Sequence, residues 1–317
     1  MRAIYYHRVV PRRDPSDPYL AGALEVAELQ AHAAELARHW RVLSLDELAA
    51  HLVGGEPLPD RAVHVSFDDG FRDNLVAAEV LDAHRLPWTL FPVVDAVLAG
   101  YRPWYVRLAD ALSVSSATAR CAGEVYDLGS TRGKVAFKAQ AKRAVMAAPA
   151  ARHVEVLEEI LSAAGLVEPE DTSAPFLCEA ELRQLAAGGI EIGNHSATHP
   201  NLAACSPAEL VREVVDSRAR LEEALGRPVR YFSYPDGRSN PAAESFVRST
   251  HRLAMSTWTA GRPLSPFGIR RYPVGPGVDD LKEVLAPGYP LRFRARRARW
   301  ALRGRARRLG WRAGARR

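Results

Sequence analysis

Two adjacent carboxylates, Asp68 and Asp69, follow an alternating apolar run in the stretch VHVSFDDGFRDN (63–74). Like charges this close raise one another's pKa unless a positive group lies nearby. Because Asp-Asp-Gly is also ordinary turn chemistry, the pair taken alone is explained equally well by a polar turn at a strand end. A divalent metal would relieve the repulsion, because one carboxylate could bind it while the other takes a proton from the bound water.

Two histidines in the stretch EIGNHSATHPNL (191–202) are further candidate ligands. His195 and His199 are four residues apart, so one helical turn or a tight loop places both imidazoles on one side. They directly follow a predicted strand, as the two aspartates do, and the carboxyl ends of parallel strands open on one face. Two histidines and a carboxylate suit Zn²⁺ or a related divalent metal, with a position left for water. The alternative is a pair of surface histidines.

A third motif, VRYFSYPDGRSN (229–240), ends a predicted strand at Tyr234 and continues into a turn at Asp236. A backbone N–H in such a turn can point at a developing oxyanion. Pro-Asp-Gly is also a common plain turn, so this motif indicates an oxyanion site only in combination with the other two motifs.

Strands and helices alternate along the chain. The predicted strands are 4–10, 62–67, 88–94, 189–194, 229–235, 252–257 and 269–275, and helices are predicted at 24–40, from Ser44, at 74–84 and at 206–225. Repeated βα units imply a mainly parallel sheet, and right-handed crossovers over this many units can close into a barrel. We expect one α/β domain over residues 1–290, with a mostly helical insertion at about 101–178 and an Arg-rich tail at 291–317.

Composition is that of a soluble globular protein, with 317 residues, 47% hydrophobic and 25% charged. The net charge of +6 is unevenly placed: residues 292–317 hold twelve arginines and no acids, which leaves 31 basic and 37 acidic residues elsewhere. Trp and Leu interleaved with Arg in the tail suggest a segment that lies on an anionic membrane. A solvated disordered tail is the alternative. Nucleic-acid binding through the arginines is disfavoured, because the tail contains no recognisable nucleic-acid module.

The cellular compartment is predicted from features that the sequence does not contain. It has no apolar run long enough to cross a bilayer, no secretory signal at its start, and three scattered cysteines without metal-type spacing. We expect a cytoplasmic protein with reduced thiols. The tail would allow peripheral attachment at the inner face of the membrane.

The motifs SFDDG (66–70), His195-x3-His199 and FSYPDG (232–237), in this order, resemble the polysaccharide deacetylases, the NodB-homology group of carbohydrate esterase family 4. YYHRV (5–9) is similar to one branch of that family. The resemblance spans roughly residues 1 to 285. It implies a distorted (β/α)7-type barrel, related to the TIM barrel, with a divalent metal: zinc, or cobalt, manganese or nickel. The expected reaction is removal of N-acetyl groups from a polysaccharide or a lipid-linked saccharide, in exopolysaccharide biosynthesis.

Residue roles follow from the resemblance by motif position. It implies that Asp68 is the general base and that Asp69, His195 and His199 bind the metal. The N–H of Asp236 would assist with the oxyanion. Tyr234, in the same motif, would contact substrate. Trp104, in the insertion, could stack on a sugar, but it is equally suited to anchoring the insertion.

Two departures concern the third motif. Relatives commonly have an aromatic residue where this chain has Asp236, and an acid beside an oxyanion is unfavourable unless its side chain turns away. Many also place an arginine there to tune the base, where this chain has Ser233. We expect Arg271 to replace it, with Arg270 and Arg230 as alternatives.

The late Leu-x-His motif that usually supplies the general acid is absent. The amide leaving group still needs a proton, because an expelled amine anion would be too basic. His7 is the candidate: poly-N-acetylglucosamine deacetylases of this family appear permuted so that the acid-bearing strand comes first. The alternative is a packed structural histidine.

Two other functions are compatible with the three motifs. One is hydrolysis of a small amide, imide or formamide on the same fold. The other is a non-catalytic carbohydrate-binding relative, which the complete set of Asp68 and the ligands argues against.

Overall fold

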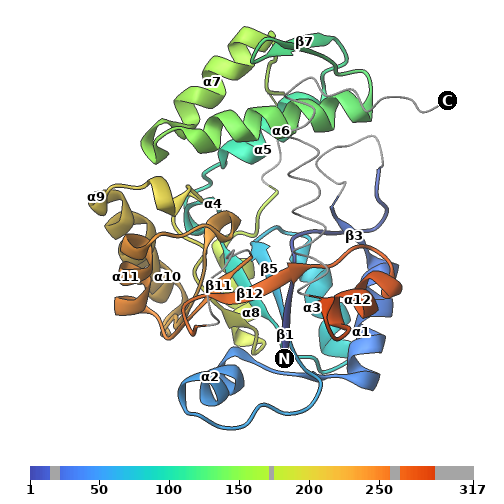
Figure 1. The fold of residues 1–317 in the computed structure, drawn as a ribbon, viewed down its shortest axis with the longest axis vertical. Helices are drawn as coiled ribbons and strands as arrows, with labels where there is room; N and C mark the ends of the chain where they lie inside the picture. The colour runs from blue at the N-terminus through green and yellow to red at the C-terminus, as the bar shows by residue number, and fades with distance from the viewer. Residues whose placement is uncertain (15–21, 171–174, 258–264, 290–317) are drawn as a thin grey trace, which may run out of the picture.

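The structure is a computed structural model that describes residues 1–14, 22–170, 175–257 and 265–289. At its centre a parallel sheet curls into a barrel (Figure 1). In pairing order, the barrel strands are β10 (Tyr231–Ser233), β11 (Leu253–Ser256), β12 (Ile269–Pro273), β1 (Arg2–Tyr6), β5 (Ala62–Asp69), β6 (Thr89–Pro92) and β9 (Glu191–Ile192). A parallel bridge between Asn194 and Phe232 joins the two ends of this row, so the barrel is nearly closed. The predicted α/β barrel is confirmed.

Helices cover the outside of the barrel. They are α1 (Val26–His39), α2 (Leu45–Val53), α3 (Asn74–Ala83), α4 (Val94–Leu98), α8 (Glu179–Ala187), α9 (Pro207–Leu210), α10 (Ser217–Leu225), α11 (Pro241–Thr250) and α12 (Val278–Leu285). All eight residues of β5 are buried, since the strand is covered on both faces. Ser44 begins α2 as predicted: its Oγ accepts from the N–H of Glu47 at 3.1 Å, and the Glu47 carboxylate accepts from the N–H of Ser44 at 2.8 Å.

Two predicted elements are interrupted in the structure. The strand expected over residues 4–10 ends at Tyr6, and β2 (Val9–Val10) pairs separately with β3 (Leu24–Glu25). The helix expected over residues 206–225 contains a π-helical segment, η3 (Val211–Asp216), between α9 and α10. Both interruptions lie close to candidate site residues. A further short strand, β4 (Arg41–Val42), pairs with the start of β5.

The insertion has its own hydrophobic cluster, which includes Leu108, Phe137, Val145 and Leu157. Its elements are α5 (Trp104–Ser113), β7 (Thr118–Cys121), β8 (Glu124–Asp127), α6 (Thr131–Ala147) and α7 (His153–Ala164). The hairpin β7–β8 was not expected in a mostly helical segment. Its turn residues, Ala122 and Gly123, both have positive φ (50° and 81°), as a two-residue hairpin turn requires. An alanine in place of the usual Asn or Asp hides this signal.

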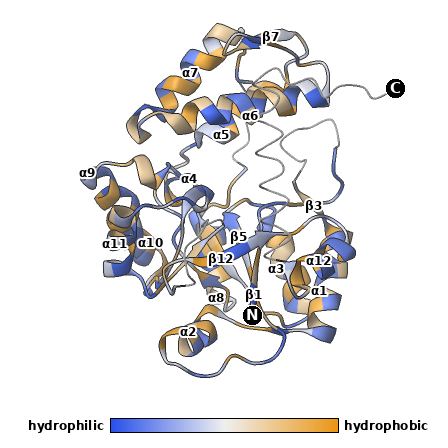
Figure 2. Ribbon diagram, in the orientation of Figure 1, coloured by the Kyte–Doolittle hydropathy of each residue, from blue (hydrophilic) through white to orange (hydrophobic). Residues whose placement is uncertain are grey.

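The insertion lies over the carboxyl ends of the barrel strands (Figure 1). Hydrophobic and hydrophilic residues alternate along α6 (Figure 2). Within the described part of the chain, each helix is too short or too polar to span a bilayer. Residues 290–317, including the tail for which membrane contact was predicted, lie outside the described residues.

Candidate active site

A cavity of about 620 Å³ lies between the strand ends and the insertion. The barrel contributes His7, Asp68, Asp69, His195, His199, Tyr234 and Asp236 to its wall. The insertion contributes Trp104, Tyr105, Leu108, Lys138 and Lys142. The structure therefore brings eight of the nine predicted site residues to one cavity, and the ninth, Arg271, contacts Asp68 directly beneath it.

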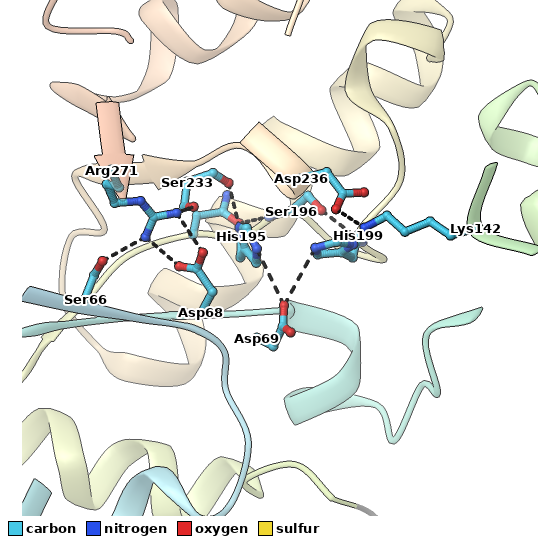
Figure 3. A network of polar contacts seen from close by, with 11 residues as sticks. Ser66, Asp68, Asp69, Lys142, His195, Ser196, His199, Ser233, Asp236 and Arg271 are labelled. Atoms are coloured by element: carbon cyan, nitrogen blue, oxygen red, sulfur yellow. Dashed lines mark hydrogen bonds and ion pairs between the residues drawn. The ribbon is translucent and has the colours of Figure 1, made fainter. Parts of the chain in front are cut away.

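Asp69, His195 and His199 form the one cluster of metal-ligand type found in the described residues, with their ligand atoms all within 4.8 Å of one another. Asp69 Oδ1 lies 3.6 Å from His195 Nε2 and 3.7 Å from His199 Nε2 (Figure 3). Two ligands about 2.1 Å from a tetrahedral zinc ion would lie about 3.4 Å apart. The observed spacing is close to that value, so the three side chains fit a divalent metal.

Two further observations support this fit. Asp69 Oδ1 is buried and has no hydrogen-bond partner among the described residues, as expected of an atom whose partner is a cation. The His195 Nδ1–H donates to the Ser233 carbonyl at 2.7 Å, which leaves the Nε2 lone pair directed to Asp69. Such a bond on the second ring nitrogen is usual for metal-binding histidines.

The backbone is strained where these side chains converge. Asp69, Ser196, His199 and Asp236 all have left-handed φ, between 53° and 75°. Each such residue costs on the order of 1–3 kcal/mol and persists only where the surrounding structure holds it. A regular strand would point Asp68 and Asp69 to opposite faces, so the φ of 75° at Asp69 is what lets both carboxylates reach one cavity.

Asp68 is clamped by a fully buried arginine. Arg271 Nη1 and Nη2 each donate to one Asp68 carboxylate oxygen at 2.7 Å, and they also donate to Ser66 Oγ at 2.8 Å and Ser233 Oγ at 2.6 Å (Figure 3). Burial alone would raise the pKa of Asp68, but the charge of Arg271 outweighs it and lowers the pKa to about 2. Asp68 is thus held ionised and in a single orientation.

The neighbouring carboxyl is perturbed in the opposite direction. Burial and the adjacent Asp68 charge raise the pKa of Asp69 to about 8 in the metal-free protein. The two aspartates therefore differ because Asp68 is paired with an arginine, whereas for Asp69 the smaller opposing effects of Tyr105 and Lys142 do not outweigh burial and the Asp68 charge. A metal bound at Asp69 would supply the missing positive charge.

Of the three arginines considered from the sequence, Arg271 is the one placed at Asp68. Arg230 pairs instead with Asp46, at 3.7 Å, at the other end of the barrel. Arg270 neighbours Arg271 on β12, where successive side chains point to opposite faces.

His7 lies immediately after β1, beside Asp68. The parallel register pairs Tyr6 with Phe67, so the next residues of the two strands are His7 and Asp68. The His7 backbone carbonyl accepts from Asn74 Nδ2 at 2.8 Å, which fixes the break after β1. The ring is exposed to the cavity, yet the surrounding protein removes hydration, and this desolvation lowers the pKa of His7 against the opposing effect of Asp68.

Asp236 is paired with a residue of the insertion. Lys142 Nζ lies 2.5 Å from Asp236 Oδ1 (Figure 3). Burial alone would raise the pKa of Asp236, but the Lys142 charge lowers it. The side chain is therefore drawn toward α6. An acid at this position is compatible with a nearby oxyanion only if its side chain turns away, and the pairing with Lys142 turns it away.

The two predicted substrate-contacting aromatics are largely covered. Trp104 is 2% exposed and belongs to the hydrophobic cluster of the insertion, so anchoring accounts for its position. Tyr234 is 1% exposed, and its hydroxyl donates to the Phe267 carbonyl at 3.3 Å. Both reach the cavity wall with little of their surface.

Several residues of the site were not anticipated from the sequence. Glu213, in the π-helical segment, is fully buried and accepts from the Thr198 N–H and hydroxyl, both at 2.8 Å, which holds the loop between the two histidines. Tyr105 packs edge-on against His199, with ring centroids 4.9 Å apart. A glutamate at an otherwise apolar helix position was the available signal for Glu213.

Sequence comparison covers the second and third motifs. A family model described as polysaccharide deacetylase matches residues 134–254, a stretch that contains His195 and His199. The Bacillus subtilis (strain 168) protein YxkH, named as a putative polysaccharide deacetylase, is 26% identical over 105 residues, which is 32% of this chain. The match spans 38% of the length of that relative.

Solved structures share the fold. Streptococcus pyogenes deacetylase PplD, in complex with acetate, aligns with a TM-score of 0.60 and 16% identity over 90% of this chain and 98% of that one. IcaB from Ammonifex degensii aligns with a TM-score of 0.56 and 19% identity over 90% of this chain and 94% of that one. The sequence match and the shared fold confirm the resemblance drawn from the motifs: this chain is similar to the polysaccharide deacetylases in part of its sequence and in its fold.

Proposed function

We propose that this chain hydrolyses N-acetyl groups of a carbohydrate with the help of a divalent metal, most simply zinc. The observation that carries the proposal is the convergence of Asp69, His195 and His199 beside a separate carboxylate, Asp68, that an arginine keeps ionised. Three ligands with an adjacent base are the arrangement of a hydrolytic metal site. The names of the family and of its relatives supply the carbohydrate substrate class.

Asp69, His195 and His199 would hold the metal, with Ser233 fixing the orientation of His195. A bound divalent metal polarises a carbonyl and brings the pKa of water to about 7. Asp68 would accept the proton of the attacking water, because Arg271 maintains its ionised form and its position.

The leaving nitrogen needs a proton, and His7, which follows β1 beside Asp68 and lines the cavity, would donate it. Desolvation lowers the pKa of His7, and the Asp68 charge offsets part of this effect in favour of the protonated imidazole. The peptide N–H of Asp236 would face the oxygen on which negative charge develops. Each of these three roles belongs to a different barrel strand end.

Acetate release from N-acetylated glucosamine oligosaccharides by the zinc-reloaded protein tests the proposal. We expect Asp68→Asn to lower kcat by about 10²–10⁴-fold with metal content retained, because the base is lost while the three candidate ligands remain. His195→Ala should lose the metal itself. The exposed residues Asp82 and His84 provide matched controls, Asp82→Asn and His84→Ala, which should change neither quantity.

The role of His7 has its own test. His7→Ala should lose activity toward N-acetyl substrates and keep it toward 4-nitrophenyl acetate, whose leaving group needs no proton. Unchanged acetate release by Asp68→Asn would refute the base, and equal losses on both substrates would refute the acid. No acetate release by the unchanged protein would refute the function.

A further inference from the structure

Asp236 places a negative charge where the proposed reaction would generate another. Its backbone is left-handed, with φ 53° and ψ 11°, and the residue lines the cavity that holds the candidate ligands. One carboxylate oxygen, Oδ1, lies 2.5 Å from Lys142 Nζ, and the other, Oδ2, is buried with no hydrogen-bond partner among the described residues. Within the described residues, Lys142 is thus the hydrogen-bonding cation of the Asp236 carboxylate.

Lys142 comes from the insertion, 94 residues before Asp236. On α6, Phe137, Ala141 and Val145 are buried in the cluster of the insertion, while Lys142 reaches the cavity. Because the buried side of the helix is anchored in this cluster, the packing of the insertion sets the point from which Lys142 extends into the cavity. Figure 3 shows the lysine extending from this helix to Asp236 above His199.

The two charges act on the ligands in opposite directions. Both groups line the cavity that holds the candidate ligands, and the Lys142 ammonium lies 2.5 Å from the Asp236 carboxylate. Seen from the ligands, the pair is therefore close to neutral. Without Lys142, Asp236 would join Asp69 as a second carboxylate of the cavity that has no cation bonded to it in the described part of the chain, whereas Asp68 keeps Arg271.

On the basis of the function proposed above, we propose that Lys142 is a positioning residue of this site: it draws the Asp236 carboxylate toward α6 and neutralises it. The peptide N–H at position 236 can then serve an anionic oxygen without repulsion from its own side chain. The insertion is thereby a working part of the site, since it supplies the cation that makes Asp236 compatible with the reaction.

A double-mutant cycle of Lys142→Met and Asp236→Asn tests this role with two readouts, kcat/KM for acetate release and affinity for Zn²⁺. In Lys142→Met we expect kcat/KM to fall about tenfold. Zn²⁺ should bind about three- to tenfold more tightly, because a positive charge near the cation is lost. Structural damage would weaken zinc binding, so the opposite signs separate the two explanations.

Adding Asp236→Asn should reverse both effects, because it removes the charge that Lys142 compensates. Lys142→Arg should resemble the unchanged protein. Lys134, on the same helix but bonded to the Ser113 carbonyl, gives the control Lys134→Met, which should change neither readout.

The role is overturned if Lys142→Met weakens zinc binding, if it behaves like Lys134→Met, or if Asp236→Asn leaves its effects in place. The zinc affinities of the four proteins could also change as expected while the unchanged protein releases no acetate. That result would support the charge compensation by Lys142 and refute the hydrolytic function instead.

Discussion

The barrel and the insertion face each other across one cavity, but they hold their side chains differently. Barrel groups such as Asp68 and His195 are buried at strand ends, are hydrogen-bonded within the chain, and lie among residues with left-handed φ. The insertion contributes from regular helices, and Lys142 is 47% exposed. The barrel thus sets the geometry of the chemistry, whereas the insertion adjusts charge and access from a separately packed unit.

Arg271→Met is the largest expected disturbance of the barrel side. A buried carboxylate that loses its partner costs about 3–5 kcal/mol of unfolding free energy. The pKa of Asp68 is lowered by Arg271, so without it the pKa rises and the acidic limb of the pH–rate profile moves to higher pH. Urea unfolding and kcat/KM between pH 5 and pH 9 would measure both effects.

Arg230→Met is the control, because Arg230 pairs with Asp46 away from the cavity. An acidic limb that stays in place in Arg271→Met would show that Asp68 is not the titrating base.

Phe137→Ala disturbs the insertion side instead. Phe137 is fully buried in the cluster of the insertion, and its truncation should cost about 3 kcal/mol. We expect an early unfolding step in urea with zinc content unchanged, since the ligands belong to the barrel. Val135→Ala, at a position 45% exposed on the same helix, is the control. Loss of zinc in Phe137→Ala would contradict the separation of the two regions.

Glu213→Gln tests whether a buried glutamate of the barrel holds the loop that carries His199. Glu213 accepts three hydrogen bonds, two from Thr198 and one from Arg212, and an amide cannot accept them all. The loop that carries His199 should loosen, so zinc affinity falls about 10–100-fold. Competition with a chelator would measure it, with the exposed Glu223→Gln as control. Equal zinc affinities of Glu213→Gln and the unchanged protein would show that the loop keeps its conformation without the Glu213 hydrogen bonds.

The smallest expected effect concerns pH and the metal-free protein. The folded pKa of Asp69, about 8, lies above its ordinary value of 3.8, so the folded state keeps a proton that the unfolded state has lost between these values. The free energy of unfolding contributed by Asp69 therefore falls as pH rises toward 8, by at most about 1.4 kcal/mol per pH unit.

The histidines with lowered pKa titrate below about pH 6.5, and at pH 6.5–8 the comparison with Asp69→Asn removes the contribution of other groups such as the N-terminal amine. Thermal or urea unfolding in the presence of EDTA should show the unchanged protein losing stability relative to Asp69→Asn across this window. Parallel pH dependences of the two proteins would contradict the raised pKa.

Much of the barrel could be predicted, because strands buried on both faces read as short apolar runs that alternate with amphipathic helices. The break after Tyr6 and the π-helical segment at Val211–Asp216 could not, because local sequence patterns do not reveal a strand that changes partners or an extra residue in a helical turn. The hairpin at Ala122–Gly123 was missed because its turn lacks the usual residues.

The sequence by itself determined which side chains meet at the strand ends. Motif order and the family resemblance placed Asp68, Asp69, His195 and His199 at strand ends that open on one face, although strand period alone would point Asp68 and Asp69 to opposite sides of β5. Only the tertiary structure decided which basic side chain pairs with each acid. Arg271 binds Asp68 although 203 residues separate them in the chain, and Lys142 binds Asp236 across 94 residues. Motifs record positions along one strand or loop, whereas charge compensation depends on which distant elements pack together.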